Sequence, residues 1–195
     1  MLPPRRSARF DEEMRTRSES DGVAALLVAL RAEGGTIAEV LLDRRPGAPR
    51  DAPGPAQVAA SGPRARGREA DYELLIEMIL EGARLHYGRP RVVCPDDPDL
   101  ALLLGDQLYA LGLSRLAAVG DLDATAELAD VISLIAQAHI ASDPELADAI
   151  WDAGAAAVGW GTSDELELAK ELVRAEDPRA RAALRLAADR VRSRR

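Results

Sequence analysis

The stretch DPDLALLLGDQLYALGLSRLAAVGD, residues 97–121, carries the pattern that decides the fold. Leucine or another apolar residue occupies nearly every side of it, which predicts a helix over 98–118 that is buried and central. Asp97 is a good N-cap because its carboxylate accepts a hydrogen bond from a helix-start N–H, and Pro98 has no N–H to leave unpaired. Gly120-Asp121 predicts the turn that ends the segment.

Further helices are predicted on both sides of this segment. The pairs Asp143-Pro144 and Asp177-Pro178 repeat the helix start of Asp97-Pro98. Apolar residues also recur at helical spacing, and no alternating strand pattern competes with them. These signals predict helices over 71–86, 123–141, 144–158, 162–173 and 178–191. The expected fold is therefore all-α, a helical bundle of about six core helices.

The N-terminal third has a different composition. Residues 1–20 are rich in charge and are expected to be disordered, and residues 21–43 predict a short helical segment that Gly34-Gly35 interrupts. Residues 44–69 contain five prolines and almost no large apolar residue, which is typical of a linker. Residues 70–195 are expected to form the all-α domain, with an arginine-rich C-terminal tail.

Composition bounds the class of protein. Of the 195 residues, 47% are hydrophobic but only 3% are aromatic, so leucine, isoleucine, valine and alanine must fill the core. The single cysteine, Cys94, excludes an internal disulfide framework and a cysteine-based zinc site, and it favours a cytoplasmic location. No apolar run reaches the ~18 residues of a transmembrane segment, and acidic residues follow the first arginines where a signal peptide would be apolar.

The charge is distributed unevenly. Residues 70–178 hold 22 acidic and 6 basic side chains, whereas residues 179–195 hold seven arginines and one aspartate. The acidic body would repel nucleic acid, so we expect no nucleic-acid partner. The arginines of the tail are interpreted as a charged helix face, with binding of an anionic partner as the alternative.

Four polar residues are candidates for ligand binding: His86, Asp106, Gln137 and His139. Asp106 interrupts the most apolar helix, so it either lines a cavity or lies in a groove or on the surface. His86 stands at a predicted helix end, where an imidazolium would favourably meet the helix dipole. Two histidines are too few for a metal site, and the sequence contains no phosphate-binding loop or nucleophile elbow. We therefore predict no catalytic residue and no metal ligand.

Two acidic groups need a separate interpretation. Glu77 and Glu81 are four residues apart and share one helix face, where a divalent cation could bridge them. Magnesium usually requires more oxygen ligands than two, so a solvated face is favoured. Asp96, Asp97 and Asp99 surround a helix start, which favours capping over a metal cluster.

Three motifs in order along the chain carry a family resemblance. LIEMI at 75–79, LH at 85–86 and LLGDQLY at 103–109 resemble helices of the trans-polyprenyl diphosphate synthases, which have the isoprenoid synthase fold. The likeness extends over roughly residues 71–140, under half of the chain, and QAH at 137–139 stands where that family has a Glu-Gly-Gln element. It implies a partial isoprenoid-synthase-like bundle and gives Asp106 and His86 their matched positions.

The departures from this family bear on catalysis. Its first aspartate-rich motif should follow His86, where this sequence has Tyr87 and Gly88. An alternative alignment places Glu77 and Glu81 on the first and last aspartates, and only then would magnesium be a cofactor. The pattern is most similar to the non-catalytic small subunit of heterodimeric heptaprenyl diphosphate synthases, a degenerate subunit that docks on a catalytic partner.

The resemblance therefore implies a non-catalytic or regulatory protein. In this interpretation the protein is a subunit of a prenyl diphosphate synthase and has no cofactor of its own. Its expected partner is a protein or a second copy of the chain, because a shortened helical fold leaves apolar surface uncovered. A hydrophobic or prenyl ligand is a further expectation. The alternative is a helical dimerisation or scaffold module without any isoprenoid link.

Overall fold

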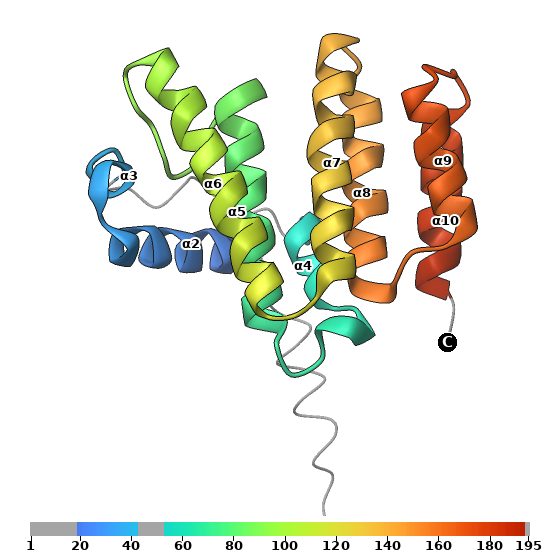
Figure 1. Cartoon of the computed structure of the whole chain (residues 1–195), viewed down its shortest axis with the longest axis horizontal. Helices are drawn as coiled ribbons and strands as arrows, with labels where there is room; N and C mark the ends of the chain where they lie inside the picture. Colours follow the sequence, from blue (N-terminus) through green and yellow to red (C-terminus); the bar gives the residue numbers. More distant parts are fainter. Residues whose placement is uncertain (1–18, 43–52, 194–195) are drawn as a thin grey trace, which may run out of the picture.

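The computed structural model describes residues 19–42 and 53–193, and in these ranges every regular element is a helix (Figure 1). The predicted all-α bundle is confirmed. The described elements are α2 (Glu19–Glu33), α3 (Gly35–Glu39), α4 (Pro55–Ala60), the 3₁₀ turn η1 (Pro63–Ala65), α5 (Glu69–Tyr87), α6 (Pro98–Ala118), α7 (Leu122–Ile140), α8 (Pro144–Trp160), α9 (Asp164–Arg174) and α10 (Ala180–Ser193). None of these helices combines the length and the apolar character needed to cross a membrane.

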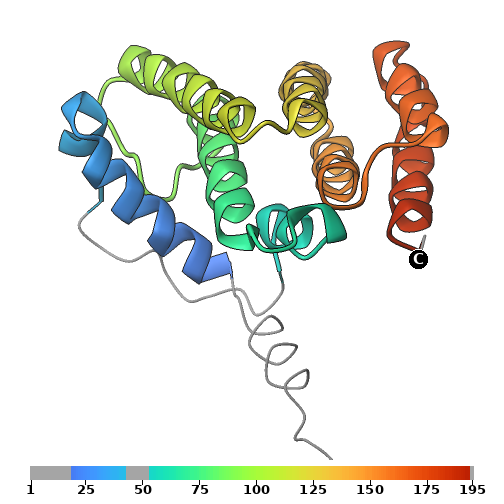
Figure 2. The same ribbon diagram turned by 60° about the horizontal axis from the view of Figure 1, so that its bottom comes forward.

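The six helices from α5 to α10 form three neighbouring pairs, α5 with α6, α7 with α8 and α9 with α10, arranged in a row (Figure 1). Short α4 lies between α5 and α8, and α2 packs along α5 on the side away from α8 (Figure 2). Within this row the pair α9–α10 contacts its neighbours α8 and α7. Helix α5 is thus contacted by α2, α4 and α6, which makes it the centre of the N-terminal part.

Side-chain caps explain why the starts of α6 and α8 agree with the sequence, whereas α10 begins at Ala180 and not at the predicted Pro178. Each capping oxygen accepts a hydrogen bond from a backbone N–H of the first turn, which would otherwise lack a partner. Four side chains accept such bonds: Asp97 from Asp99 N at 2.9 Å, Asp121 from Ala124 N at 3.0 Å, Asp143 from Leu146 N at 2.9 Å and Ser163 from Leu166 N at 3.2 Å. Capping rather than metal binding is therefore the role of Asp97.

The buried apolar residues form two clusters that meet at α7 and α8. The first joins α2, α4, α5, α6 and the N-terminal half of α7, and the second joins α7, α8, α9 and α10. The partly buried Trp151 packs against both clusters. One residue of α8 thereby connects the two cores.

The prediction that 98–118 would be the central helix is wrong. Helix α6 buries one face, which includes Leu104, Leu108 and Leu116, while Leu102 and Leu103 are 45% and 66% exposed. Helix α5 takes the central position. The error arose because Glu77 and Glu81 on α5 suggested a solvated face, whereas the leucines around α6 suggested burial on all sides.

The linker prediction for 44–69 fails over the part that the structure describes. Helix α4 and η1 fall inside this range, and Ala56, Ala59 and Ala65 are fully buried. Small residues make this packing possible: a Cβ atom on Gly62 would lie 2.2 Å from the carbonyl oxygen of Gly159. The expectations for residues 1–18 and 43–52 lie outside the described residues.

This backbone contact between η1 and α8 predicts the effect of Gly62→Ala. Gly62 has φ −75°, which any residue can adopt, so the added methyl group acts only through its clash with Gly159. We expect the free energy of unfolding to fall by about 1–3 kcal/mol, measured by urea unfolding. The exposed neighbour Arg66→Ala should change it by less than about 0.5 kcal/mol. Equal unfolding midpoints for the two variants would contradict the contact.

Candidate functional site

A column of three glutamates on α5 points into the protein. Glu73, Glu77 and Glu81 are spaced by four residues and therefore share one helix face. Their exposed fractions are 4%, 0% and 0%. The expected solvated face for Glu77 and Glu81 is therefore wrong, and each buried carboxylate needs a donor to be tolerated.

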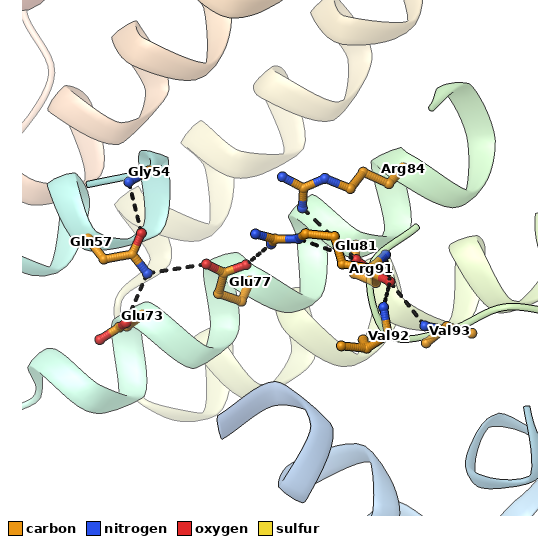
Figure 3. Close-up of polar contacts among 9 residues, drawn as sticks. All are labelled: Gly54, Gln57, Glu73, Glu77, Glu81, Arg84, Arg91, Val92 and Val93. Atoms are coloured by element: carbon orange, nitrogen blue, oxygen red, sulfur yellow. Dashed lines mark hydrogen bonds and ion pairs between the residues drawn. The ribbon is translucent and has the colours of Figure 1, made fainter. Parts of the chain in front are cut away.

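Gln57 supplies donors to two of these carboxylates. Its side-chain amide donates to Oε1 of Glu73 at 2.9 Å and to Oε1 of Glu77 at 3.2 Å, while its carbonyl oxygen accepts from Gly54 N at 3.0 Å (Figure 3). Gly22 of α2 lies over the same point, where a Cβ atom would be 2.7 Å from the amide nitrogen of Gln57. Helices α2, α4 and α5 thus converge on one polar contact.

Arg91, in the connection between α5 and α6, completes the network. Its guanidinium donates to Oε2 of Glu77 and lies 3.9 Å from Oε2 of Glu81 (Figure 3). Oε1 of Glu81 accepts from the backbone N–H groups of Arg91, Val92 and Val93, at 2.7, 2.6 and 3.1 Å. Glu81 therefore holds the α5–α6 connection in place. The donors for the carboxylates of Glu77 and Glu81 come from within the chain.

These hydrogen bonds argue against the alternative in which Glu77 and Glu81 bind a magnesium ion. Oxygen atoms that a cation would need already accept hydrogen bonds from Arg91, Gln57 and the backbone. Within residues 19–42 and 53–193 no cluster of three or more His, Cys, Asp or Glu residues is suited to hold a metal. A divalent ion at this pair would have to displace the partly buried guanidinium of Arg91.

Two of the four candidate residues meet at the crossing of α5 and α6. Nε2 of His86 lies 3.1 Å from Oδ1 of Asp106, and the Asp106 side chain is 71% exposed. Of the two alternatives for Asp106, a cavity or a groove or surface position, the structure has the exposed one. A Cβ atom on Gly105 would lie 2.7 Å from the imidazole, so Gly105 makes room for His86 beside Asp106. His86 thus faces α6 rather than the end of its own helix.

The third candidate, His139, joins the same region through stacked rings. The ring centroids of Tyr109 and His86 are 5.2 Å apart, those of His86 and Tyr87 are 5.5 Å apart, and those of Tyr87 and His139 are 4.5 Å apart. This series of rings connects α6, α5 and α7. Burial raises the pKa of the Tyr109 hydroxyl well above its ordinary value. The fourth candidate, Gln137, is exposed on α7, and no described side-chain contact joins it to the others.

A groove of about 500 Å³ opens beside these rings. Its walls come from the start of α4, the C-terminal end of α5, the C-terminal end of α7 and the N-terminal half of α8. Residues of four helices, from Pro53 to Asp152, line it. Of these lining residues only His139 is a candidate from the sequence, because no local pattern brings together residues so far apart in the chain.

A second buried charge cluster lies between α7 and α9. Nζ of Lys170, whose side chain is 7% exposed, is 2.9 Å from Glu127, 3.0 Å from Asp130 and 2.8 Å from Glu167. Burial favours the neutral amine, but the hydrogen bonds to these carboxylates outweigh it and raise the pKa of Lys170. The cluster ties α9 to α7 and has the contacts of a structural element.

The arginines of the C-terminal region are largely neutralised by neighbouring carboxylates. Arg192 binds Asp152 with two hydrogen bonds, Arg181 pairs with Glu145, and Arg190 lies 3.4 Å from Glu165. The interpretation as a charged helix face is confirmed for these described residues.

Comparison with known proteins adds no relative: no family model, no curated protein and no solved structure matches this chain. The functional argument therefore depends on the geometry of the α5 network, the stacked rings and the groove.

Removal of Arg91 tests whether it neutralises the α5 glutamates. Arg91→Met should lower the free energy of unfolding by about 3–5 kcal/mol, because it leaves buried carboxylates unpaired. Arg89→Met, two residues earlier and exposed, should cost less than about 0.5 kcal/mol. Adding Glu77→Gln to Arg91→Met should recover part of the loss. Urea unfolding measures all three, and equal costs for the two arginine variants would contradict the network.

The surroundings of Glu77 predict how the free energy of unfolding depends on pH in the wild type compared with Glu77→Gln. Burial raises the pKa of Glu77, while Arg91 and Gln57 oppose this shift without cancelling it. The folded state thus holds this proton more tightly than the unfolded chain. The stabilisation that this proton linkage contributes is complete below the unfolded pKa of about 4.3 and is lost as the pH rises through the folded pKa.

We therefore expect the wild type to lose stability relative to Glu77→Gln as the pH rises from about 4 to about 7. Urea unfolding at intervals across this range measures the difference. Glu39→Gln, at an exposed side chain outside this network, serves as the control and should show no such trend. A difference between wild type and Glu77→Gln that stays constant or grows in favour of the wild type would overturn the assignment.

Proposed function

We propose that this protein is a non-catalytic helical subunit that acts by binding a partner, in the cytoplasm, with a prenyl diphosphate synthase as that partner. The observation that carries the proposal is the neutralisation of Glu77 and Glu81 by Arg91 and by backbone N–H groups. Helix α5 is where the alternative alignment, with Glu77 and Glu81 on the family's first and last aspartates, would place metal ligands. Its carboxylates instead stabilise the fold of this chain.

The chemistry of prenyl transfer explains why this matters. Ionisation of an allylic diphosphate needs metal ions, held by carboxylates, to stabilise the charge of the departing group. Glu77 and Glu81 are buried and accept hydrogen bonds from donors of this chain, so their oxygen atoms are not available to hold metal ions. Accessory action through a catalytic partner is the role that remains consistent with the resemblance.

The outer face of α6 supports a protein partner. Leu102 and Leu103 are adjacent and 45% and 66% exposed, although α6 lies against the body of the protein along its other face. Single exposed leucines are common on protein surfaces, but two together on one helix are a reasonable point of contact. The identity of the partner as a prenyl synthase rests on the motifs at 75–79 and 103–109.

A second candidate function is a helical dimerisation or scaffold module without any link to isoprenoids. The exposure of Asp106 favours it, because a cavity-lining acid would be buried, whereas this side chain is 71% exposed and contacts His86. Gly105 and Asp106 then have a purely architectural role at the α5–α6 crossing. On this proposal the exposed leucines of α6 contact a second copy of the chain.

An activity assay tests the absence of independent catalysis. Purified protein mixed with farnesyl diphosphate, isopentenyl diphosphate and magnesium should form no elongated product, and Glu77→Ala should behave in the same way. Metal-dependent product formation by the protein alone, abolished in Glu77→Ala, would overturn the non-catalytic proposal and support the alternative alignment.

Sedimentation of the same samples, alone and with a catalytic prenyl synthase, separates the two functions. A complex with the synthase that changes its product length, and that is lost in Leu103→Glu, supports the accessory subunit. A homodimer that is lost in Leu103→Glu but retained in Leu168→Glu supports the scaffold. Leu168 on α9 is the matched control, because its side chain is 65% exposed and that of Leu103 is 66% exposed. A strict monomer that leaves the synthase unchanged contradicts both.

A further inference from the structure

The groove beside the stacked rings lies between two helix walls. The C-terminal end of α5 and the two residues after it form one wall, the N-terminal half of α8 forms the other, and short α4 lies between them (Figure 2). The groove measures about 500 Å³, which is within the usual range of ligand pockets. Helices rather than a long loop therefore provide most of its walls.

Aromatic and apolar side chains cover part of both walls. Tyr87 and His139 stack with their ring centroids 4.5 Å apart and their planes at 13°, and both line the groove, as does Trp151 of α8. Trp151 also packs against both hydrophobic clusters, which limits the positions of its ring. Leu80 and Ala147 add apolar surface on the α5 and α8 sides. Such a lining favours a ligand that has a planar ring of its own.

Each wall carries two charged side chains of one sign: Arg84 and Arg89 on the α5 side, and Asp148 and Asp152 on the α8 side. One charge of each wall is already paired within the chain. Arg84 lies 4.0 Å from the buried Glu81, and Asp152 accepts hydrogen bonds of 2.7 and 3.0 Å from Arg192. Neither Arg84 nor Asp152 is therefore counted as a charge for a ligand.

Arg89 and Asp148 are the charges that remain. Both residues are exposed, and within residues 19–42 and 53–193 neither of them forms an ion pair. They do not pair with each other, although they line the same groove. The groove thus offers a ligand one cation on the α5 wall and one anion on the α8 wall, with no net charge.

A ligand that matches these two charges carries both signs itself. A guanidinium binds a carboxylate through paired N–H donors, and an ammonium group donates hydrogen bonds to a carboxylate. A zwitterion therefore finds a partner for each of its charges, whereas a simple anion or cation meets one partner and one like charge. An amino acid with an aromatic side chain combines both charges with a planar ring.

We propose that this groove binds a free aromatic amino acid in its zwitterionic form. The carboxylate of the ligand is held by Arg89, its ammonium group by Asp148, and its ring lies against Tyr87 and Trp151. This site is independent of the proposed function, because it requires neither a protein partner nor prenyl chemistry.

Four phenyl compounds that differ in charge test the proposal: L-phenylalanine, 3-phenylpropanoate, 2-phenylethylammonium and 2-phenylethanol. The second lacks the ammonium group, the third lacks the carboxylate and the fourth is uncharged, while L-alanine keeps both charges without the ring. Binding is followed by titration calorimetry and by ¹H–¹⁵N NMR of the tryptophan indole N–H groups, assigned with Trp160→Phe. We expect L-phenylalanine to bind most tightly and to shift the signal of Trp151 but not that of Trp160, which lies outside the groove.

Matched variants assign each charge to one side chain. Arg89→Gln should weaken L-phenylalanine binding roughly tenfold and should not weaken 2-phenylethylammonium binding, which involves no carboxylate. Asp148→Asn should weaken L-phenylalanine binding by a similar factor and should not weaken 3-phenylpropanoate binding. Arg185→Gln and Asp164→Asn, at exposed residues outside the groove, should change none of these affinities. Thermal unfolding by circular dichroism confirms that each variant is folded.

Several results would overturn the proposal. Equal affinity for the four phenyl compounds would indicate an apolar surface without charge recognition. Tighter binding of 3-phenylpropanoate or 2-phenylethylammonium than of L-phenylalanine would indicate a site for a single charge. L-Alanine binding as tight as that of L-phenylalanine would exclude a role for the rings. An unmoved Trp151 signal at the highest L-phenylalanine concentration would mean that the groove binds no such ligand.

Discussion

The structure depends on the burial of three carboxylates on one helix. Glu73, Glu77 and Glu81 are removed from water, and buried charges persist only when they are paired and hydrogen-bonded. The donors come from Gln57 on α4 and from Arg91 in the α5–α6 connection, two segments that flank α5 in the sequence. Satisfying the glutamates therefore fixes where both segments lie.

Close backbone contacts determine the rest of the arrangement. Gly62 and Gly159 allow η1 to approach α8, and Gly105 allows His86 to pack across α6. A side chain at any of these positions would push two elements apart, in a core that is otherwise closely packed. Polar contacts thus select which elements meet, and glycines set how near they come.

The limits of prediction from this sequence follow from the range of each signal. Helix starts were predictable because Asp97, Asp121, Asp143 and Ser163 cap the N–H groups of residues two or three positions away. Burial of Glu77 was not predictable, since its partners Gln57 and Arg91 are 20 and 14 residues distant. The same holds for the candidate site: Asp106 could be suspected from its apolar surroundings, but its contact with His86 spans two helices, and alanine-rich α4 resembled a linker.

The polar network and the groove are parts of one construction. Gln57 accepts a hydrogen bond from Gly54 N, which holds the Pro53–Pro55 edge of the groove, and Glu81 lies beneath the Arg84 side chain on the opposite wall. Glu81 also fixes the start of the connection that follows Arg89, through the N–H groups of Arg91 and Val92. The carboxylates of α5 therefore hold α4 and the α5–α6 connection in place on the two sides of the groove.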